Sequence, residues 1–249
     1  MASSTDSPVQ PLSAEQMVRL WEIGQRQRPI DRALTFLLFG CRGASWETLA
    51  GLSIGQRDAS LLLLRERTFG PRLDSLATCP ACQEKLEFTL STIDLRVEQG
   101  RTPVHHFQSE GLSIQFRLPN STDLAAIAPV SDPAAARQKL ARRCVLQAHE
   151  GDQALDFEVL PERAIAQLNQ QLIAADPQAE ILLDLTCPAC GHQWQTLFDI
   201  ARYFWTELAA QAQRLLSEVH QLATAYGWRE ADILALSSTR RQYYLELVR

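Results

Sequence analysis

The tetrapeptide Cys-Pro-Ala-Cys occurs twice in the chain, at residues 79–82 and at residues 187–190. A two-residue gap lets one tight turn point both thiols at the same metal ion, and two such turns supply the four ligands of a tetrahedral zinc site. Four thiolates complete that coordination shell, so the pattern predicts one structural zinc per chain and disfavours a catalytic one. The predicted ligands are Cys79, Cys82, Cys187 and Cys190.

The residues around both copies are typical of small β-hairpins with the cysteines at their tips. We therefore expect residues 76–90 and 181–198 to form the two halves of a zinc ribbon. Residues 83–186 separate the two cysteine pairs, a gap far longer than in an ordinary zinc finger. Either a domain is inserted into one ribbon, or the pairs are separate features. A metal-free remnant and two redox pairs remain open, although thioredoxin-like pairs favour a βαβ context that this sequence lacks.

The residues that follow the two cysteine pairs differ. Gly191 follows the second pair, whereas Gln83 follows the first. Glycine suits this position because it adopts positive φ angles without a steric penalty. The first half of the metal site therefore fits the pattern less well. His192 is a further potential ligand, but with four thiols present we expect it to lie on the surface or beside the ligands.

Composition narrows the class of protein. The 249-residue chain is 46% hydrophobic and 21% charged, as in ordinary globular proteins, and is long enough to bury a core. The net charge of −5 disfavours nucleic-acid binding, and no apolar run reaches the length of a membrane span.

Residues 1–12 lack a signal-peptide pattern, so we expect a disordered lead and a cytoplasmic protein. Cys41 and Cys144 are predicted to be buried free thiols.

Helix signals dominate the N-terminal part, residues 13–75. Ser13 and Ser53 each precede a glutamine by three residues, the spacing of a capping box. Helices are also predicted over residues 32–39 and 57–69.

The segment between the predicted hairpins, residues 91–180, is expected to be an inserted α/β unit that is mostly helical. Alternating apolar and polar residues predict a strand over residues 112–118. Helices are predicted over residues 122–127, 133–149 and 161–175.

The C-terminal part, residues 199–249, begins with the longest predicted helix, residues 199–226. Its apolar residues recur at three- and four-residue intervals, and Gly227 is a typical left-handed helix end. Two short helices, residues 228–236 and 240–248, close the chain. The predicted fold class is therefore α+β and predominantly helical: a zinc-ribbon-like pair of hairpins with a long insertion, closed by a long C-terminal helix.

The remaining histidines do not indicate a site. His105 and His106 are adjacent on an extended segment, so their side chains point to opposite faces and a shared role is not expected. His220 lies near the apolar face of the long helix, where a core or interface role is the default interpretation. No nucleophile–base pair, phosphate-binding loop or paired-carboxylate pattern stands out, so we expect no enzymatic activity and no small-molecule substrate.

Two other features of residues 194–249 are candidate binding surfaces. Arg240 and Arg241 are interpreted as a helix-end charge cluster that complements Glu246 and solvent. Aromatic residues gather around the second hairpin and the start of the long helix, at positions Trp194, Phe198, Tyr203, Phe204 and Trp205. Because three consecutive helical residues cannot all face the core, those off the apolar stripe are candidates for binding a partner.

Short segments spread over most of the chain carry a family resemblance. They are Arg57–Phe69 with Gly70, Cys79–Cys82, Arg117-Leu118-Pro119, Asp176-Pro177-Gln178-Ala179, Leu185–Trp194, Val219-His220, Tyr226-Gly227-Trp228, Ile233–Leu236, Arg240-Arg241 and Tyr244-Leu245. The C-terminal segments are the most specific. With these segments the chain resembles the baseplate hub assembly chaperone family of T-even-type phages, which also occurs in operons of phage-tail-like contractile injection systems.

The resemblance implies a non-enzymatic assembly factor for the baseplate hub of a contractile tail. The implied partners are hub, spike or tape-measure proteins, with no membrane and no nucleic acid. A minor structural subunit of the mature baseplate is the alternative, and the protein would then be particle-associated. A zinc-ribbon protein that binds nucleic acid is less favoured, because residues 83–90 carry one Lys and two Glu and residues 191–199 carry no Lys or Arg.

Overall fold

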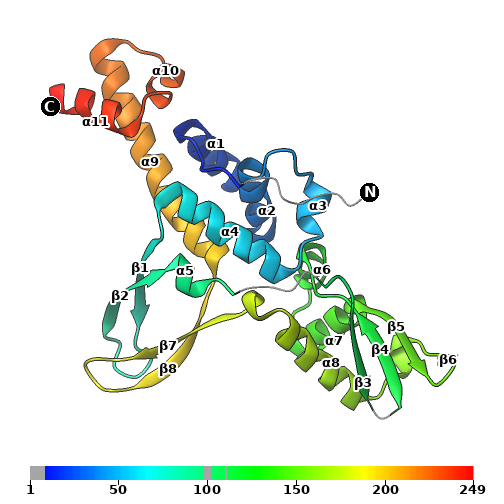
Figure 1. Ribbon diagram of the computed structural model, residues 1–249. Coiled ribbons are helices and arrows are strands. Elements are labelled where there is room, and N and C mark those ends of the chain that lie inside the picture. The colour runs from blue at the N-terminus through cyan, green and yellow to red at the C-terminus, as the bar shows by residue number, and fades with distance from the viewer. Residues whose placement is uncertain (1–8, 98–101, 110, 249) are drawn as a thin grey trace.

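The structure is a computed structural model that describes residues 9–97, 102–109 and 111–248. It is a mixed α+β fold, mostly helical, in which three arms extend from a central helical body (Figure 1). The α-helices are α1 (Ala14–Gly24), α2 (Pro29–Gly40), α3 (Trp46–Ala50), α4 (Ile54–Phe69), α5 (Thr92–Leu95), α6 (Ser121–Ile127), α7 (Pro133–Cys144), α8 (Glu162–Ala175), α9 (Ile200–Tyr226), α10 (Glu230–Leu234) and α11 (Ser238–Leu247). Two 3₁₀-helices are η1 (Phe157–Val159) and η2 (Pro177–Ala179).

Within the described residues, the strands form three antiparallel sheets. Two are isolated hairpins, β1–β2 and β7–β8, and the third has the order β3-β4-β5-β6. The strands are β1 (Arg72–Thr78), β2 (Lys85–Ser91), β3 (His105–Ser109), β4 (Leu112–Phe116), β5 (Val145–Glu150), β6 (Gln153–Ala154), β7 (Ile181–Thr186) and β8 (Gln193–Phe198).

The central body packs α1, α2 and α4 against α9. Phe36 of α2 stacks on Phe204 of α9 with ring centroids 4.5 Å apart, and both rings are almost fully buried. One face of α9 enters this core because its apolar residues repeat every three or four positions, as predicted. These residues are Ile200, Phe204, Leu208, Ala212, Leu215, Val219 and Leu222.

Capping residues set the helix boundaries that the sequence predicts. Ser13 and Ser53 both form complete capping boxes at the starts of α1 and α4. Asp199 caps α9 by accepting a hydrogen bond from the Arg202 N–H, and Gly227 ends it with φ 67°.

The N-terminal lead needs a correction. Residues 1–8 lie outside the described part of the chain, but the predicted disordered segment extended to residue 12. Val9 instead forms a β-bridge with Cys41, and Leu12 is buried in the central core. Packing of the body therefore includes the residues just before α1.

The segment between the hairpins forms its own layer of helix on sheet. On one face of β4, Ile114 is buried in a cluster with Ala164 of α8. Phe116 is buried in a cluster with Ala141 of α7 and Leu168 of α8. The predicted helix over residues 133–149 is wrong in its last third, since α7 ends at Cys144 and residues 145–150 pair with β4 as strand β5. Hydrogen bonding to β4 outweighs the local helical pattern, because helix propensity is a weak prior that tertiary context overrides.

This unit contacts the central body through a polar junction at the start of α4. The carboxylate of Asp176 accepts the Gly55 N–H at 2.9 Å, and the Pro119 carbonyl accepts the Ile54 N–H at 3.0 Å. Gln178 is fully buried beside them; its amide oxygen accepts the Val97 N–H and its NH₂ group donates to a carbonyl of α5. An acid at the N-terminus of α4 satisfies an unpaired donor and complements the helix dipole.

Among the described residues, no helix is both long enough and apolar enough to cross a membrane.

Candidate metal centre

The four cysteine side chains of the two repeated motifs meet at the tips of the hairpins. The sulfur atoms all lie within 4.8 Å of one another, with Cys79 3.7 Å from Cys190 and Cys82 3.6 Å from Cys187. Metal–sulfur bonds of about 2.3 Å in a tetrahedron place the sulfurs about 3.8 Å apart. The cluster can therefore hold one metal ion without moving its backbone.

The two turns that carry these thiols have the same backbone geometry. The N–H of Gln83 donates to the carbonyl of Cys79, and the N–H of Gly191 donates to that of Cys187, both at 2.9 Å. Both turns then need a left-handed residue: Gly191 has φ 72° and Gln83 has φ 63°, the one positive φ among the described non-glycine residues. The missing glycine in the first motif thus changes the strain of the turn and not its shape.

The surroundings of the cluster give the Cys79 and Cys82 thiols different pKa values. Burial raises the pKa of the Cys79 thiol, but two backbone N–H groups of its own turn and two neighbouring thiols lower it, and the net effect brings it to about 7. The N–H of Glu84 lowers the pKa of Cys82, but the Cys190 thiol, burial and the other thiols raise it to about 12. A metal cation must displace the protons that remain, so metal affinity falls as pH falls.

Each hairpin has one half-buried face, and the thiols join the two hairpins at their tips. In β7–β8 the cross-strand pairs Leu185–Trp194 and Ile181–Phe198 lie on the half-buried face. In β1–β2 the corresponding pair is Ser75–Phe88. The sulfur pairs place the end of β1 beside the start of β8 and the start of β2 beside the end of β7.

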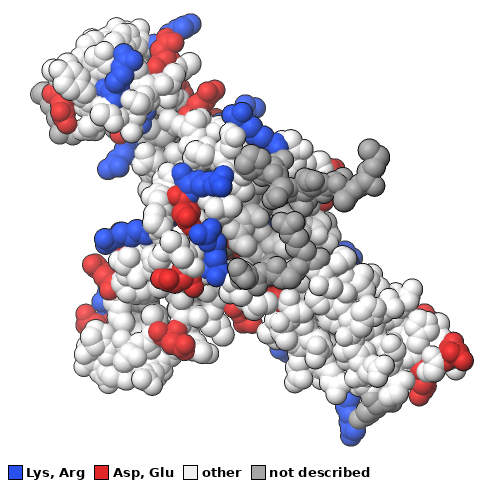
Figure 2. Space-filling model, viewed as in Figure 1, with Lys and Arg blue, Asp and Glu red and all other residues white. Residues whose placement is uncertain are grey.

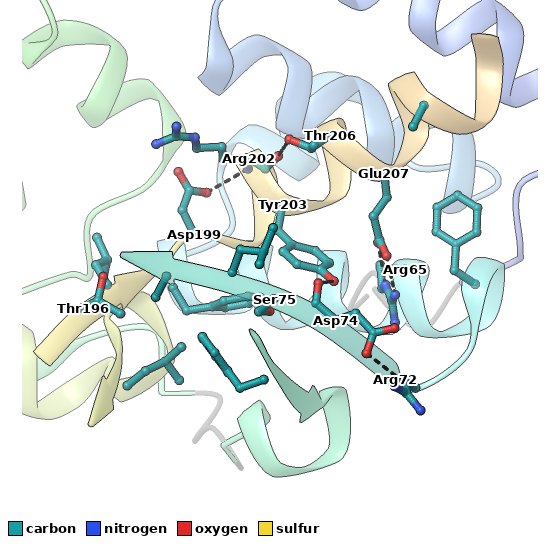
Figure 3. Close-up of a pocket in the computed structure, with 18 of the residues that line it drawn as sticks. Arg65, Arg72, Asp74, Ser75, Thr196, Asp199, Arg202, Tyr203, Thr206 and Glu207 are labelled. Carbon is teal, nitrogen blue, oxygen red and sulfur yellow. Dashed lines mark hydrogen bonds and ion pairs between the residues drawn. The ribbon is translucent and has the colours of Figure 1, made fainter. Parts of the chain in front are cut away.

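At the other end of the hairpins, an ion pair joins the helices that carry them. Arg65 of α4, whose side chain is 3% exposed, binds both carboxylate oxygens of Glu207 of α9 at 2.8 and 2.6 Å. It also donates to the carbonyl of Gly70, where α4 turns into β1. Beside this pair the Tyr203 hydroxyl donates to the carbonyl of Asp74 in β1 at 2.8 Å (Figure 3). The pattern-based prediction missed Arg65, because a single arginine in a helix carries no sequence signal of burial.

The aromatic residues at the start of α9 are engaged within the chain. Phe204 is fully buried, whereas Tyr203 and Trp205 on either side of it are half-buried, as expected for residues off the apolar stripe. Arg32 lies 3.9 Å from the centre of the Trp205 ring. Their predicted role in binding a partner remains a prediction.

His192 lies beside the cysteine cluster, where its carbonyl accepts the Cys187 N–H, and the other singled-out side chains lie elsewhere. His192 is exposed and stacks on Trp194, His220 is exposed and not in the core, and His105 stacks on Phe116. The sequence indicated that Arg240 and Arg241 complement Glu246 and solvent, but Arg241 has a different partner. It is 5% exposed and binds Glu218 of α9 at 2.6 Å, because the helix-end cluster folds back onto α9.

The thiols of Cys41 and Cys144 are buried and free, as predicted.

The sequence matches the family described as T4 bacteriophage base plate protein over residues 14–205. The chain belongs to this family. The matched range covers the central body, both hairpins, the segment between them and the start of α9. It confirms the baseplate resemblance, although the C-terminal segments that carry part of that resemblance lie beyond residue 205. No curated protein and no solved structure is detectably similar to this baseplate protein.

Proposed function

We propose that this baseplate-family protein is a non-enzymatic assembly chaperone for the baseplate hub of a contractile tail or of a phage-tail-like injection system. Family membership is the observation that carries the proposal. Its clients would be hub, spike or tape-measure proteins.

The surface supports a protein-binding role. Exposed aliphatic and aromatic side chains on several arms are suited to binding other proteins. In the view of Figure 2, acidic and basic side chains are interspersed and wide areas carry neither, which is unlike the basic face that nucleic-acid binding requires. Side chains that are more than half exposed include Leu76, Val159, Ile173, Leu197, Tyr243 and Leu247.

The metal in this proposal is one structural zinc per chain. Four thiolates at tetrahedral distances favour zinc, and they leave no open position for a substrate or a water. Cys79, Cys82, Cys187 and Cys190 would hold it. The ion would join two hairpins that lie far apart in the sequence, so its binding energy would contribute to folding.

The experiment is deletion of the gene in cells that produce the particle, followed by electron microscopy and quantitative mass spectrometry of purified particles. A chaperone is required for baseplates to form, yet is absent from finished particles. The protein at a fixed stoichiometry in finished particles would contradict the chaperone role and favour a minor structural subunit. Normal particle yield after deletion would contradict both.

A further inference from the structure

An open groove of about 1190 Å³ lies between β1 and β8, with α9 along one side. Consecutive residues of both strands line it, residues 74–78 of β1 and 196–198 of β8. Side chains of a strand alternate between its two faces, so a run of consecutive lining residues shows that the groove reaches the edge of β1. Phe88, Leu183 and Trp194 also line the groove, so it extends over the half-buried faces of both hairpins as well. We call this cavity the β1/β8 groove.

The hydrogen bonds of the hairpin show which backbone groups of β1 point into the groove. Thr92 N–H donates to the Pro71 carbonyl and Cys79 N–H to the Glu84 carbonyl, so odd-numbered residues of β1 are the ones bonded to β2. The N–H and C=O groups of Leu76 and its even-numbered neighbours therefore point away from β2. The bond from the Tyr203 hydroxyl to the Asp74 carbonyl confirms this direction independently.

Beyond Asp74, whose carbonyl accepts the Tyr203 hydroxyl, this edge is open. Within the described residues, no strand other than β2 pairs with β1. The Leu76 side chain is 73% exposed in the groove and Leu197 of β8 is 57% exposed on the opposite wall. Natural proteins cover such edges or place charges on them, because an open apolar edge binds any available strand.

The charges of the groove are only partly paired. Arg65 binds Glu207 and Arg72 binds Asp74 (Figure 3). Arg202 and Arg214 also line the groove, and their side chains form no ion pair within the part of the chain that the structure describes. Asp199 lines the groove too, but its carboxylate caps α9 by accepting the Arg202 N–H. Four arginines and three acids give the groove a net charge of +1, which favours an acidic ligand.

We propose that the free edge of β1 binds an extended, acidic segment of a partner protein as an added β-strand. The segment would exchange backbone hydrogen bonds with Leu76 and Thr78, place aliphatic side chains near Leu76 and Leu197, and place a carboxylate near Arg202 or Arg214. That the partner is another baseplate protein rests on the proposed function; the strand site itself does not.

The test uses proline, which removes one N–H group. In Leu76→Pro the lost N–H points into the groove, so the β1–β2 ladder keeps its bonds. Glu87→Pro is the matched control, because Glu87 lies directly opposite Leu76 and its N–H points to the other free edge of the same hairpin. Circular dichroism and metal content establish that both variants are folded.

The first probe is a fluorescent nine-residue peptide that alternates valine with aspartate, titrated into the full chain. Binding should be at least tenfold weaker for Leu76→Pro and within twofold of wild type for Glu87→Pro. Hydrogen exchange should show the Leu76 and Thr78 amides becoming protected. Equal loss in both variants, protection elsewhere, or no binding of the wild-type chain at millimolar peptide would overturn the strand site.

The second probe is co-expression with the other baseplate proteins of the same operon. A baseplate protein that co-purifies with wild type and Glu87→Pro, and is lost with Leu76→Pro, supports both the site and the proposed function. Retention by Leu76→Pro contradicts the site for that partner. If none co-purifies with wild type while the peptide result holds, the proposed function fails and the strand site stands.

Discussion

Two connections between distant parts of the chain, one joining the hairpins and one joining the segment between them to α4, differ in chemistry. At the hairpin tips, four thiols from a repeated motif lie within 4.8 Å of one another. At the start of α4, the polar junction uses Asp176, Gln178 and the Pro119 carbonyl, each in a different role. Both connect residues that lie far apart in the sequence, but only the cysteine cluster can be seen in the sequence as a repeated motif.

The two connections also differ in expected strength. Metal binding by thiolates contributes on the order of 10 kcal/mol of apparent binding free energy at neutral pH. A typical hydrogen bond contributes only about 1 kcal/mol net to stability. A buried donor or acceptor that loses its partner costs about 1–3 kcal/mol. The cysteine cluster should therefore control whether the fold forms, and the junction should control how firmly the inserted segment is attached to the body.

The largest effect should follow loss of two metal ligands. The double substitution Cys187→Ser and Cys190→Ser should lower the free energy of unfolding by about 4 kcal/mol or more, or Tm by about 10 °C. Differential scanning calorimetry of the zinc-loaded proteins measures this. Cys41→Ser, which alters a free thiol away from the cluster, should change Tm by only a few degrees. A double variant with the wild-type Tm would show that the cluster does not stabilise the fold.

The polar junction should give a smaller effect. Gln178→Ala removes two hydrogen bonds and leaves the half-buried Val97 N–H and the buried Leu95 carbonyl without these partners, so we expect a loss of about 2 kcal/mol in urea unfolding. The matched control is Gln195→Ala, which removes an exposed glutamine that bonds to Asp184, with an expected change below about 0.5 kcal/mol. Equal effects of the two substitutions would show that the junction does not stabilise the fold.

Low pH should weaken the ion pairs that Asp123 of α6 forms with Arg117 and Arg143. Burial raises the pKa of Asp123, but hydrogen bonds from Arg117, the Asn120 N–H and Arg143, together with the charge of Arg117, lower it overall. A pKa held below its unfolded value stabilises the fold above the unfolded pKa, and this contribution is lost as pH falls through the folded pKa.

Asp123→Asn should therefore cost about 2 kcal/mol at pH 7 and progressively less in acid. Urea unfolding from pH 7 down to pH 3, with metal content followed in parallel, separates this effect from metal release. A difference between variant and wild type that stays constant with pH would contradict the ionic role of Asp123.

The smallest effect should come from the turn after the first cysteine pair. Gln83 adopts the left-handed conformation that Gly191 adopts in the second turn, so Gln83→Gly should stabilise the protein by about 0.5 kcal/mol. Gly191→Gln should destabilise it by about 1 kcal/mol. Thermal unfolding of both variants measures the difference, and the same sign for both would show that the turns are not equivalent.

The sequence was informative where residue identity and spacing alone determine the structure. The cysteine pairs, the capping residues Ser13 and Ser53, and the period of α9 predicted the clustered thiols, two helix starts and the face of the longest helix. Each of these features depends on residues a few positions apart in the chain, or on a motif that is repeated.

The sequence was not informative where distant partners decide the structure. Residues 145–150 form a strand because β4 lies beside them, and Arg65 and Arg241 are buried because acids on α9 receive them. Asp176 and Gln178 belong to a segment that carries the family resemblance, but the pattern alone did not show that they contact α4 and α5. Their contacts lie roughly a hundred positions away in sequence, beyond the reach of local pattern reasoning.

The central claim is that one metal ion joins the two hairpins. Elemental analysis of the purified native chain, with cobalt replacement to report the coordination geometry, tests it most directly. The expected result is one zinc per chain and, after replacement, the absorption spectrum of tetrahedral cobalt bound by four thiolates. Two ions per chain, none, or a spectrum that requires a nitrogen or oxygen ligand would contradict it.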